Sequence, residues 1–287
     1  MSTHERPTTT QTGPDPAEAA AAAARAAGVT VRDLADIGDL QQAVVLLSRI
    51  WGRQANPPVT LELLRAFAKA GNHVAGAFDG DRLLGACVGF FHAPLEDALH
   101  SHIAGVAPEA LGRSVGFALK VHQREWTLAR GVTEIAWTFD PLVGRNAWFN
   151  ISKLAATPAE YLPNFYGAML DDINGDGDSD RLLVRWSLRA PSVEQACAGS
   201  PRVPVVPPDA TVALAADAAG APVPGPADAE VCLVAVPRDV TRLRTGDPGL
   251  AADWRTAVRA TLTGLFADGA RVVGFTRSGS YVLRRTP

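Results

Sequence analysis

The chain has 287 residues, enough for one large domain or two small ones, and 47% of them are hydrophobic, so an extensive core can form. The net charge of −3 offers no basic field to hold a nucleic acid, and we expect no such partner. Three widely spaced cysteines form no CxxC or Cys/His cluster, so neither a disulfide frame nor a metal site is expected. No apolar run reaches the ~18 residues of a membrane helix, and no signal-peptide pattern is present, so we expect a cytoplasmic protein without a membrane partner.

The first half of the chain alternates between predicted helices and strands. Residues 1 to about 15 are polar and predicted to be disordered, and the alanine-rich stretch after them predicts a short helix ending at Gly28. Apolar spacing and turn residues then predict, in chain order, a strand at 29–34, helices at 37–52 and 60–71, a hairpin over 73–93, a strand at 98–108, a helix at 113–130, a strand at 132–141 and a short helix at 145–156. This order favours an α/β fold in which helices flank a mixed sheet.

The second half is predicted to be less regular. A loop over 157–180 precedes a strand at 181–190, and the tail predicts a strand at 230–237, a helix at 248–269 and a hairpin over 270–285. The chain therefore divides into an N-terminal extension (1–28), an α/β core (29–190), a linker rich in proline and alanine (191–228) and an extra C-terminal strand-helix-hairpin unit (229–287).

The stretch from Val106 to Ala118 places an arginine and two glycines where a strand leads into a helix. A helix N-terminus offers unpaired backbone N–H groups and the positive end of a dipole, which together attract phosphate. Gly116 has no Cβ, so a pyrophosphate can approach the backbone closely. The alternative is an ordinary helix start in which the glycine serves packing.

The order of elements and one motif resemble the GNAT superfamily of acyl-CoA-dependent N-acyltransferases. The superfamily's phosphate loop reads Q/R-x-x-G-x-G/A, and residues 113–118 match it. The resemblance implies that acetyl-CoA or another acyl-CoA is bound as co-substrate by Val106, Arg113, Ser114, Val115, Gly116, Phe117 and Ala118. It also implies that two adjacent parallel strands splay apart and hold the thioester between them.

The next segment, RNAWFNISKLAA, resembles the superfamily's helix after an asparagine, which implies that Arg145 and Asn146 contact the acyl-CoA arm. A helix N-cap is the alternative for Asn146. Four further segments, HSHIAGVAPE, WTFDPLVGRNAWFN, YLPNFYG and SDRLLVRWSL, together resemble one branch of predicted acetyltransferases. Some members of that branch are linked with N-acylamino-acid racemases and proposed to succinylate amino acids.

Amine acylation needs a base for the amine and a donor for the leaving thiolate. His100 and His102 lie two residues apart on the strand before the phosphate loop, so they share a face and either could be the base, unless a bulge near Gly105 changes that face. The family's frequent acid, a tyrosine, aligns with Ile151, which cannot donate a proton.

The nearest phenols are Tyr161 and Tyr166, which would serve as the acid if the loop at 157–170 folds over the site. The alternatives are a partly buried histidine pair that hydrogen-bonds within the sheet and phenols that serve packing. Asp140 would orient a ligand or form a turn, and Arg255 and Arg259 would form an anion site or a solvent-facing helix surface.

The segment Asp172–Asp180 resembles the front half of a calcium loop, but position twelve is Leu183 instead of a glutamate, so a polar surface turn is expected. Taken together, these features predict transfer of an acetyl or succinyl group from acyl-CoA to a primary amine of a small molecule, such as an amino acid, by direct attack in a ternary complex. A homodimer is possible. The alternatives are a catalytically silent acyl-CoA-binding module and a protein-lysine acyltransferase.

Overall fold

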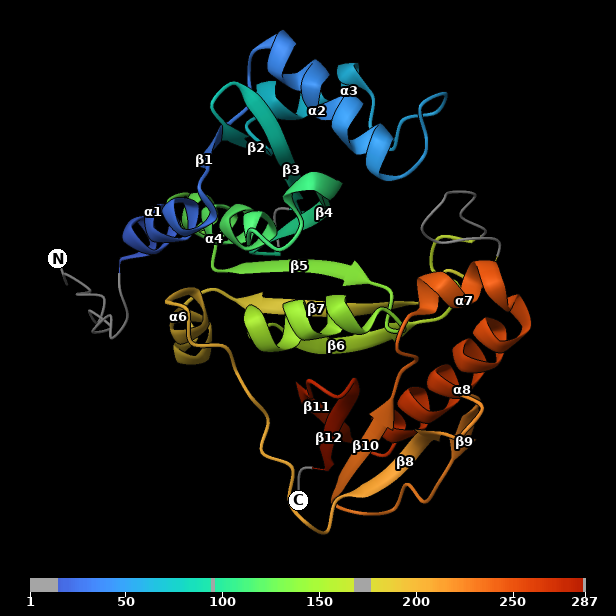
Figure 1. Ribbon diagram of the computed structural model, residues 1–287. Helices are drawn as coiled ribbons and strands as arrows, with labels where there is room; N and C mark the ends of the chain where they lie inside the picture. Colours follow the sequence, from blue (N-terminus) through green and yellow to red (C-terminus); the bar gives the residue numbers. More distant parts are fainter. Residues whose placement is uncertain (1–14, 94–95, 168–176, 286–287) are drawn as a thin grey trace, which may run out of the picture.

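The structure is a computed structural model that describes residues 15–93, 96–167 and 177–285. Almost all of the segment predicted to be disordered, and the first half of the calcium-like segment, lie outside these residues. The described strands form two sheets, one of seven strands and one of five, which Figure 1 shows above and below each other.

The first sheet has the strand order β1-β2-β3-β4-β5-β7-β6. Its strands are β1 (Thr30–Asp33), β2 (His73–Asp79), β3 (Arg82–Phe91), β4 (Ala98–Val106), β5 (Glu134–Phe139), β6 (Thr157–Leu162) and β7 (Arg181–Ser187). β4 and β5 run parallel, whereas the other neighbours pair antiparallel, so the predicted mixed sheet is confirmed. β6 lies within the segment 157–180 that was expected to be a loop.

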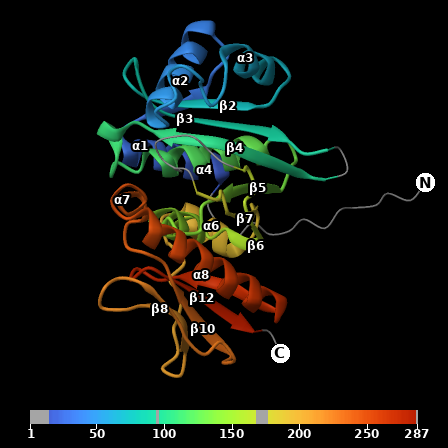
Figure 2. The ribbon, with the colours of Figure 1, turned by 90° about the vertical axis from the view of Figure 1, so that its right-hand side faces the viewer.

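Helices cover both faces of the first sheet: α1 (Pro16–Ala27), α2 (Ile37–Ile50), α3 (Leu61–Lys69) and α4 (Val115–Leu128). α2 lies on one face, where a Cβ on Gly105 would meet Leu47, Ile50 and Trp51 within 3.2 Å. α4 lies on the other face, where a Cβ on Gly85 would meet side chains of α4. Figure 2 shows α2 and α3 together on the side of β2 and β3 away from α4.

α1 is the predicted alanine-rich helix, and it packs on α4. Its buried residues are Ala19, Ala23 and Ala27, spaced one turn apart, and Gly28 ends it in the left-handed conformation. The N-terminal extension is therefore part of the packed core from Pro16 onward.

The second sheet has the strand order β11-β12-β10-β8-β9. Its strands are β8 (Thr211–Ala216), β9 (Pro222–Pro224), β10 (Val231–Ala235), β11 (Ala270–Phe275) and β12 (Ser280–Arg285). The predicted strand, helix and hairpin of the tail are present as β10, α8 (Pro248–Ala267) and β11–β12, and a short helix α7 (Val240–Gly246) precedes α8. The segment expected to be a linker contains the helix α6 (Pro191–Cys197), which contacts α1, and the strands β8 and β9, so the second sheet is larger than predicted.

Buried ion pairs join the two sheets. Arg255 on α8 contacts both oxygens of Asp140 at 2.8 Å, and Arg244 on α7 also pairs with Asp140. Arg259 on α8 contacts Asp180 at 2.6 and 2.9 Å. Arg255 and Arg259 thus face the first sheet, and the expectation of a solvent-facing helix surface is wrong. The sequence does not show this because their partners Asp140 and Asp180 lie far away along the chain.

No helix among the described residues is long and apolar enough to cross a membrane.

Candidate active site at the β4–β5 gap

β4 and β5 separate after a short parallel pairing. The paired residues run from Ala98 with Glu134 to His100 with Ala136 and end there. β4 continues to Val106 and keeps its pairing with β3 on the other side. Residues 101–106 of β4 therefore have no β5 partner, and this edge of β4 can hydrogen-bond to a ligand in the gap.

The two candidate bases lie on β4 at the start of this gap. The β3–β4 register pairs Gly89 with Ser101 and Val88 with Ile103, which leaves His102 as the extra residue of a β-bulge. The bulge is thus three residues before the position considered in the sequence. The two imidazoles still share a face, since both lie against Phe90, with ring centroids 5.1 Å (His100) and 5.8 Å (His102) away.

The environment sets the protonation of both imidazoles. Burial, followed by the neighbouring His102 and His92, lowers the pKa of His100 to about 4. His102 is exposed at the side of the bulge, and partial desolvation lowers its pKa as well. Both rings are therefore neutral near pH 7, the form that accepts a proton.

The loop after β4 is shaped by two residues with left-handed backbone. Gly112 has φ +84° and Ser114 has φ +64°, and α4 begins directly afterwards at Val115. The N–H groups of Phe117 and Ala118 donate to the Ser114 carbonyl oxygen within the first turn. Among the described residues, the N–H groups of Ser114, Val115 and Gly116 donate to no protein acceptor, and a concave set of three donors results.

Gly116 is not required by packing within the protein. A Cβ at this position would meet only Val106, at the ordinary contact distance of 3.5 Å. The space at the Cβ position of Gly116 is therefore open on every side but that of Val106.

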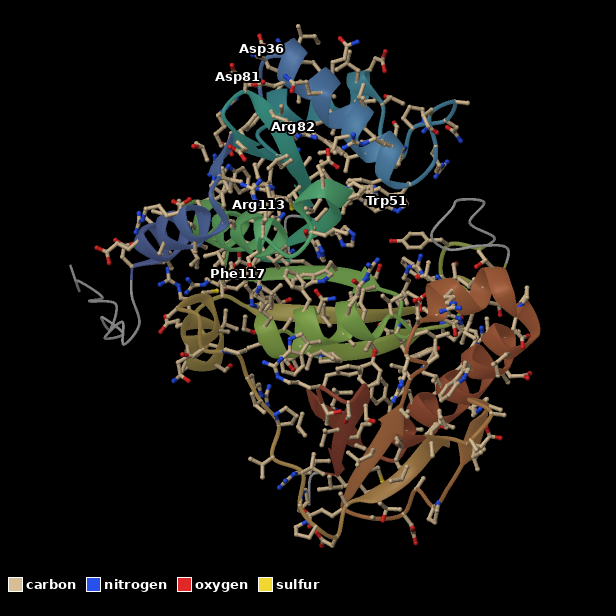
Figure 3. The ribbon with its side chains drawn as sticks, viewed as in Figure 1. Asp36, Trp51, Asp81, Arg82, Arg113 and Phe117 are labelled. Carbon is tan, nitrogen blue, oxygen red and sulfur yellow. The ribbon has the colours of Figure 1, made fainter. Side chains whose placement is uncertain are left out.

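Two basic residues lie near this loop, Arg113 and Lys153, and only the side chain of Lys153 points toward it. Arg113 turns away: its guanidinium donates to the carbonyls of Ala27 and Gly28 and pairs with Asp79, so it binds the end of α1 (Figure 3). Lys153 turns toward the loop, with Nζ 3.1 Å from the Ser114 hydroxyl oxygen and 4.9 Å from the centroid of the Phe117 ring. Partial burial lowers the pKa of Lys153. The sequence showed this lysine only as part of ISKLAA, and it was not selected as a site residue.

Arg145 and Asn146 lie on the short helix α5 (Gly144–Ala147), which leads into the π-helical turn Trp148–Lys153. Arg145 is exposed and Asn146 is half-buried, and neither side chain has a hydrogen-bond partner among the described residues. The N-cap alternative for Asn146 is wrong, because Val143 occupies the cap and the Asn146 N–H already donates to the Val143 carbonyl.

The two candidate phenols lie in different surroundings. Tyr161 on β6 is buried, and its hydroxyl donates to Asp180 at 2.6 Å beside α8; burial and this bond raise its pKa well above the ordinary value. Tyr166 is 44% exposed, with its hydroxyl 3.2 Å from Oγ of Thr138 on β5. Thr138 lies two residues after Ala136, the partner of His100, so Tyr166 reaches the β5 side of the gap.

Asp140, just after β5, is fully engaged. Its two arginine partners and the N–H of Leu142 lower its pKa to about 2 despite burial, which by itself would raise it. The turn expected there is present, and the carboxylate is not free to orient a ligand. Ile151, at the position of the family's tyrosine, is buried.

Two hollows of the described surface lie outside this gap. One of about 320 Å³ is lined by β6, the end of α8 and Arg271. Another of about 450 Å³ lies between α2, Arg82 and Glu109. Neither includes the histidines or the loop, so the gap is identified from its backbone and side chains rather than from its volume.

Comparison with known proteins gives structural similarity only. No family model and no curated protein matches the chain. Similar solved structures include an N-acetyltransferase from Staphylococcus aureus (15% identity, TM-score 0.47, 56% of this chain and 98% of that one). A GNAT-family acetyltransferase from Streptococcus pneumoniae has 13% identity and a TM-score of 0.46, over 55% of this chain and 97% of that one.

A third similar structure is a Salmonella typhimurium protein described as an acetyltransferase and solved with its cofactor acetyl-CoA (14% identity, TM-score 0.45, 56% and 94% covered). At these identities and scores the similarity alone establishes no activity. The splayed parallel pair β4–β5 and the loop before α4 agree with what the resemblance in the sequence implies for the first sheet and its helices.

Proposed function

We propose that this protein is an N-acyltransferase that moves an acyl group from acyl-CoA to a primary amine of a small molecule. The observation that carries the proposal is the continuity of one binding path. The unpaired edge of β4 over residues 101–106 leads, through the turn of residues 107–113, to the N–H groups of Ser114, Val115 and Gly116 at the start of α4. A single elongated ligand with a thioester at one end and a diphosphate further along fits this path.

The diphosphate of coenzyme A binds the N–H groups of Ser114, Val115 and Gly116 at the positive end of the α4 dipole. This set of N–H groups is smaller than residues 114–118 would offer, because the N–H groups of Phe117 and Ala118 donate within the helix. Lys153, next to Ser114, supplies a compensating positive charge. Arg113 supports the loop through α1 instead of touching the ligand, while Arg145 and Asn146 remain candidates for contact with the acyl-CoA arm.

The thioester lies in the gap, where a backbone N–H on the free edge of β4 polarises its carbonyl oxygen. The same N–H stabilises the oxyanion of the tetrahedral intermediate, since it points to the place where negative charge develops. Holding amine and thioester together in a ternary complex supplies much of the remaining acceleration.

His102 is the proposed general base. It is exposed beside the gap, neutral near pH 7, and on the strand that holds the thioester. It accepts the proton of the ammonium substrate, directly or through water, so that the free amine attacks the carbonyl carbon. His100, more buried and with a pKa of about 4, contributes to the shape of the acceptor side and is the weaker base.

Tyr166 is the proposed acid, which gives its phenolic proton to the thiolate of coenzyme A as the C–S bond breaks. It is exposed and reaches the β5 side of the gap through Thr138. Tyr161 is unsuited to this role, because its proton is committed to Asp180. The acceptor is proposed to be a small amine, in keeping with the aromatic wall of Phe90 and the histidines.

The test measures thiol release from acetyl-CoA and succinyl-CoA against a panel of amino acids, small amines and lysine peptides, together with the binding of each acyl-CoA by calorimetry. Acylation of a small amine, identified by mass spectrometry, supports the proposal. Acyl-CoA binding with no acylated amine would instead support the silent binding module, and acylation of peptides alone would support the protein-lysine acyltransferase. Absence of acyl-CoA binding would overturn all three.

A further inference from the structure

Three potential metal ligands meet at the edge of the first sheet, separate from the β4–β5 gap. Asp33 ends β1, His73 begins β2, and His122 lies on α4, nearly two turns beyond Gly116. β1 and β2 pair antiparallel with Asp33 opposite Ala75, which brings Asp33 beside the start of β2. One ligand atom from each of the three residues lies within 4.8 Å of the other two.

Two imidazole nitrogens in this cluster have no hydrogen-bond partner. Nε2 of His73 and Nδ1 of His122 are both buried and unpaired, and the whole His73 side chain is buried. A buried polar atom without a partner is unfavourable and uncommon. Two of them next to one carboxylate indicate a ligand that all three residues share.

We propose that Asp33, His73 and His122 bind a divalent transition-metal ion, with Zn²⁺ as the first choice and a water as fourth ligand. Imidazole and carboxylate are ligands that Zn²⁺ prefers, and two histidines with one carboxylate leave one position open. This inference departs from the expectation, based on the cysteines, that the protein has no metal site.

The surroundings of the cluster include one fixed contact. Nε1 of Trp126 donates to Oδ2 of Asp33 at 3.1 Å and orients the carboxylate, as outer contacts of metal sites do. Glu125 lies near His122, while Arg130 and Lys120 add positive charge near His73.

Metal binding requires a change in the orientation of the Gln123 side-chain amide. Metal binding through Nε2 of His73 requires a proton on Nδ1, and Nδ1 now lies 3.3 Å from the amide nitrogen of Gln123. The amide oxygen of Gln123 accepts from Lys120 at 2.8 Å. Metal binding therefore requires the amide to turn its oxygen toward His73. A Gln123→Glu variant presents an acceptor oxygen to His73 in either orientation and also pairs with Lys120, so it should bind the metal more tightly.

A bound metal would stabilise the packing of three elements against one another. It would hold β1, β2 and the middle of α4 together, and α4 carries the proposed phosphate loop at its N-terminus. The site therefore has a structural role that stability measurements detect without any assay of activity.

The experiment uses the full chain without a purification tag, stripped with a chelator and dialysed. It is titrated with ZnCl₂ by calorimetry, and with CoCl₂ while visible absorption is recorded, because tetrahedral cobalt absorbs strongly. One ion per chain, a tetrahedral cobalt spectrum and a rise in Tm of roughly 5 °C at a hundredfold excess of Zn²⁺ over its dissociation constant are expected.

Asp33→Asn and His122→Gln should each abolish the cobalt spectrum and the Tm shift, whereas His92→Asn, a histidine outside the cluster, should retain both. Gln123→Glu should lower the dissociation constant about tenfold, within the range reported for outer partners of metal ligands. Absence of stoichiometric binding, or the same binding in both cluster variants as in the parent, would overturn the proposal and leave water as the partner of the two nitrogens. If one cluster variant does not fold, the other decides.

Discussion

Replacing Gly116 by alanine tests whether this glycine serves ligand binding or the stability of the protein. In the free protein the new Cβ would contact Val106 at 3.5 Å, an ordinary distance, and no other atom within 4 Å. Alanine is favoured over glycine inside a helix by up to about 1 kcal/mol, and less in a first turn such as this one. The free energy of unfolding should therefore stay constant or rise slightly, with Tm changing by no more than roughly 2–4 °C.

Acyl-CoA binding should respond in the opposite direction. The added methyl group occupies the space above the N–H groups of Ser114, Val115 and Gly116, so the diphosphate can no longer approach them. A hydrogen bond to a charged group contributes about 1.5–3 kcal/mol. The loss of even one predicts acyl-CoA binding about ten- to a hundredfold weaker, since each tenfold corresponds to about 1.4 kcal/mol.

Calorimetric titration with acetyl-CoA and thermal unfolding of the same samples give both quantities. Gly264→Ala is the matched control, because Gly264 lies within α8 with ordinary backbone and open space around it. This control should show the small gain in stability with unchanged binding. If Gly116→Ala is folded and binds acetyl-CoA as tightly as the parent, the diphosphate does not lie on this loop and the reasoning from the free N–H groups is refuted.

Three further variants test the site and its support. His102→Gln should lower kcat about 10²- to 10⁴-fold with little change in KM for acyl-CoA. It should also remove the fall in kcat/KM that the parent shows below pH 6.5, because the lowered pKa of His102 keeps the imidazole neutral above that pH. His92→Asn is the control, and a pH profile of His102→Gln equal to that of the parent would contradict the assignment. Lys153→Met should weaken acetyl-CoA binding about tenfold in calorimetry. Lys69→Met, at an exposed position of α3, is the control and should bind as tightly as the parent. Equal affinity of Lys153→Met and the parent would exclude Lys153 as a phosphate contact. The carboxyl of Asp140 has its pKa lowered from 3.8 to about 2, so it contributes about 2 kcal/mol of stability that is complete above pH 4 and lost as the pH falls toward 2. Asp140→Asn should cost about 3–5 kcal/mol at pH 7 and flatten that acidic dependence in denaturant titrations, and retention of the parent slope would show that other carboxyls dominate it.

Two strands that sequence reasoning missed, β6 and β9, lie at sheet edges, where proline is tolerated. β6 reads TPAEYL and ends the first sheet, and β9 is Pro222–Pro224 at the edge of the second. Proline within a run argues against a strand, and only the finished sheet shows that the strand is an edge strand. The other strands of the first sheet and the long helices have strong periodic patterns and were predicted correctly, whereas β8, an interior strand of the second sheet, was missed.

The site was predictable to the extent that it depends on local backbone. The pair His100 and His102 and the proposed phosphate loop follow each other on one strand and its turn, so their proximity is visible in the sequence. The partners of Asp140 lie 104 and 115 residues away on other helices, and Lys153 meets Ser114 across 39 residues. Contacts of this separation depend on the packing of whole elements, which no local pattern encodes.

The arginines of α8 also limit how this chain can be divided. Asp140 and Asp180 lie in the first 190 residues, but Arg255 and Arg259 belong to the tail. A fragment that stopped at 190 would lose these ion pairs and would expose to water the surface that α7 and α8 cover. The tail is therefore packed against the front portion, and a gene fusion that transferred only residues 1–190 would deliver a less stable polypeptide.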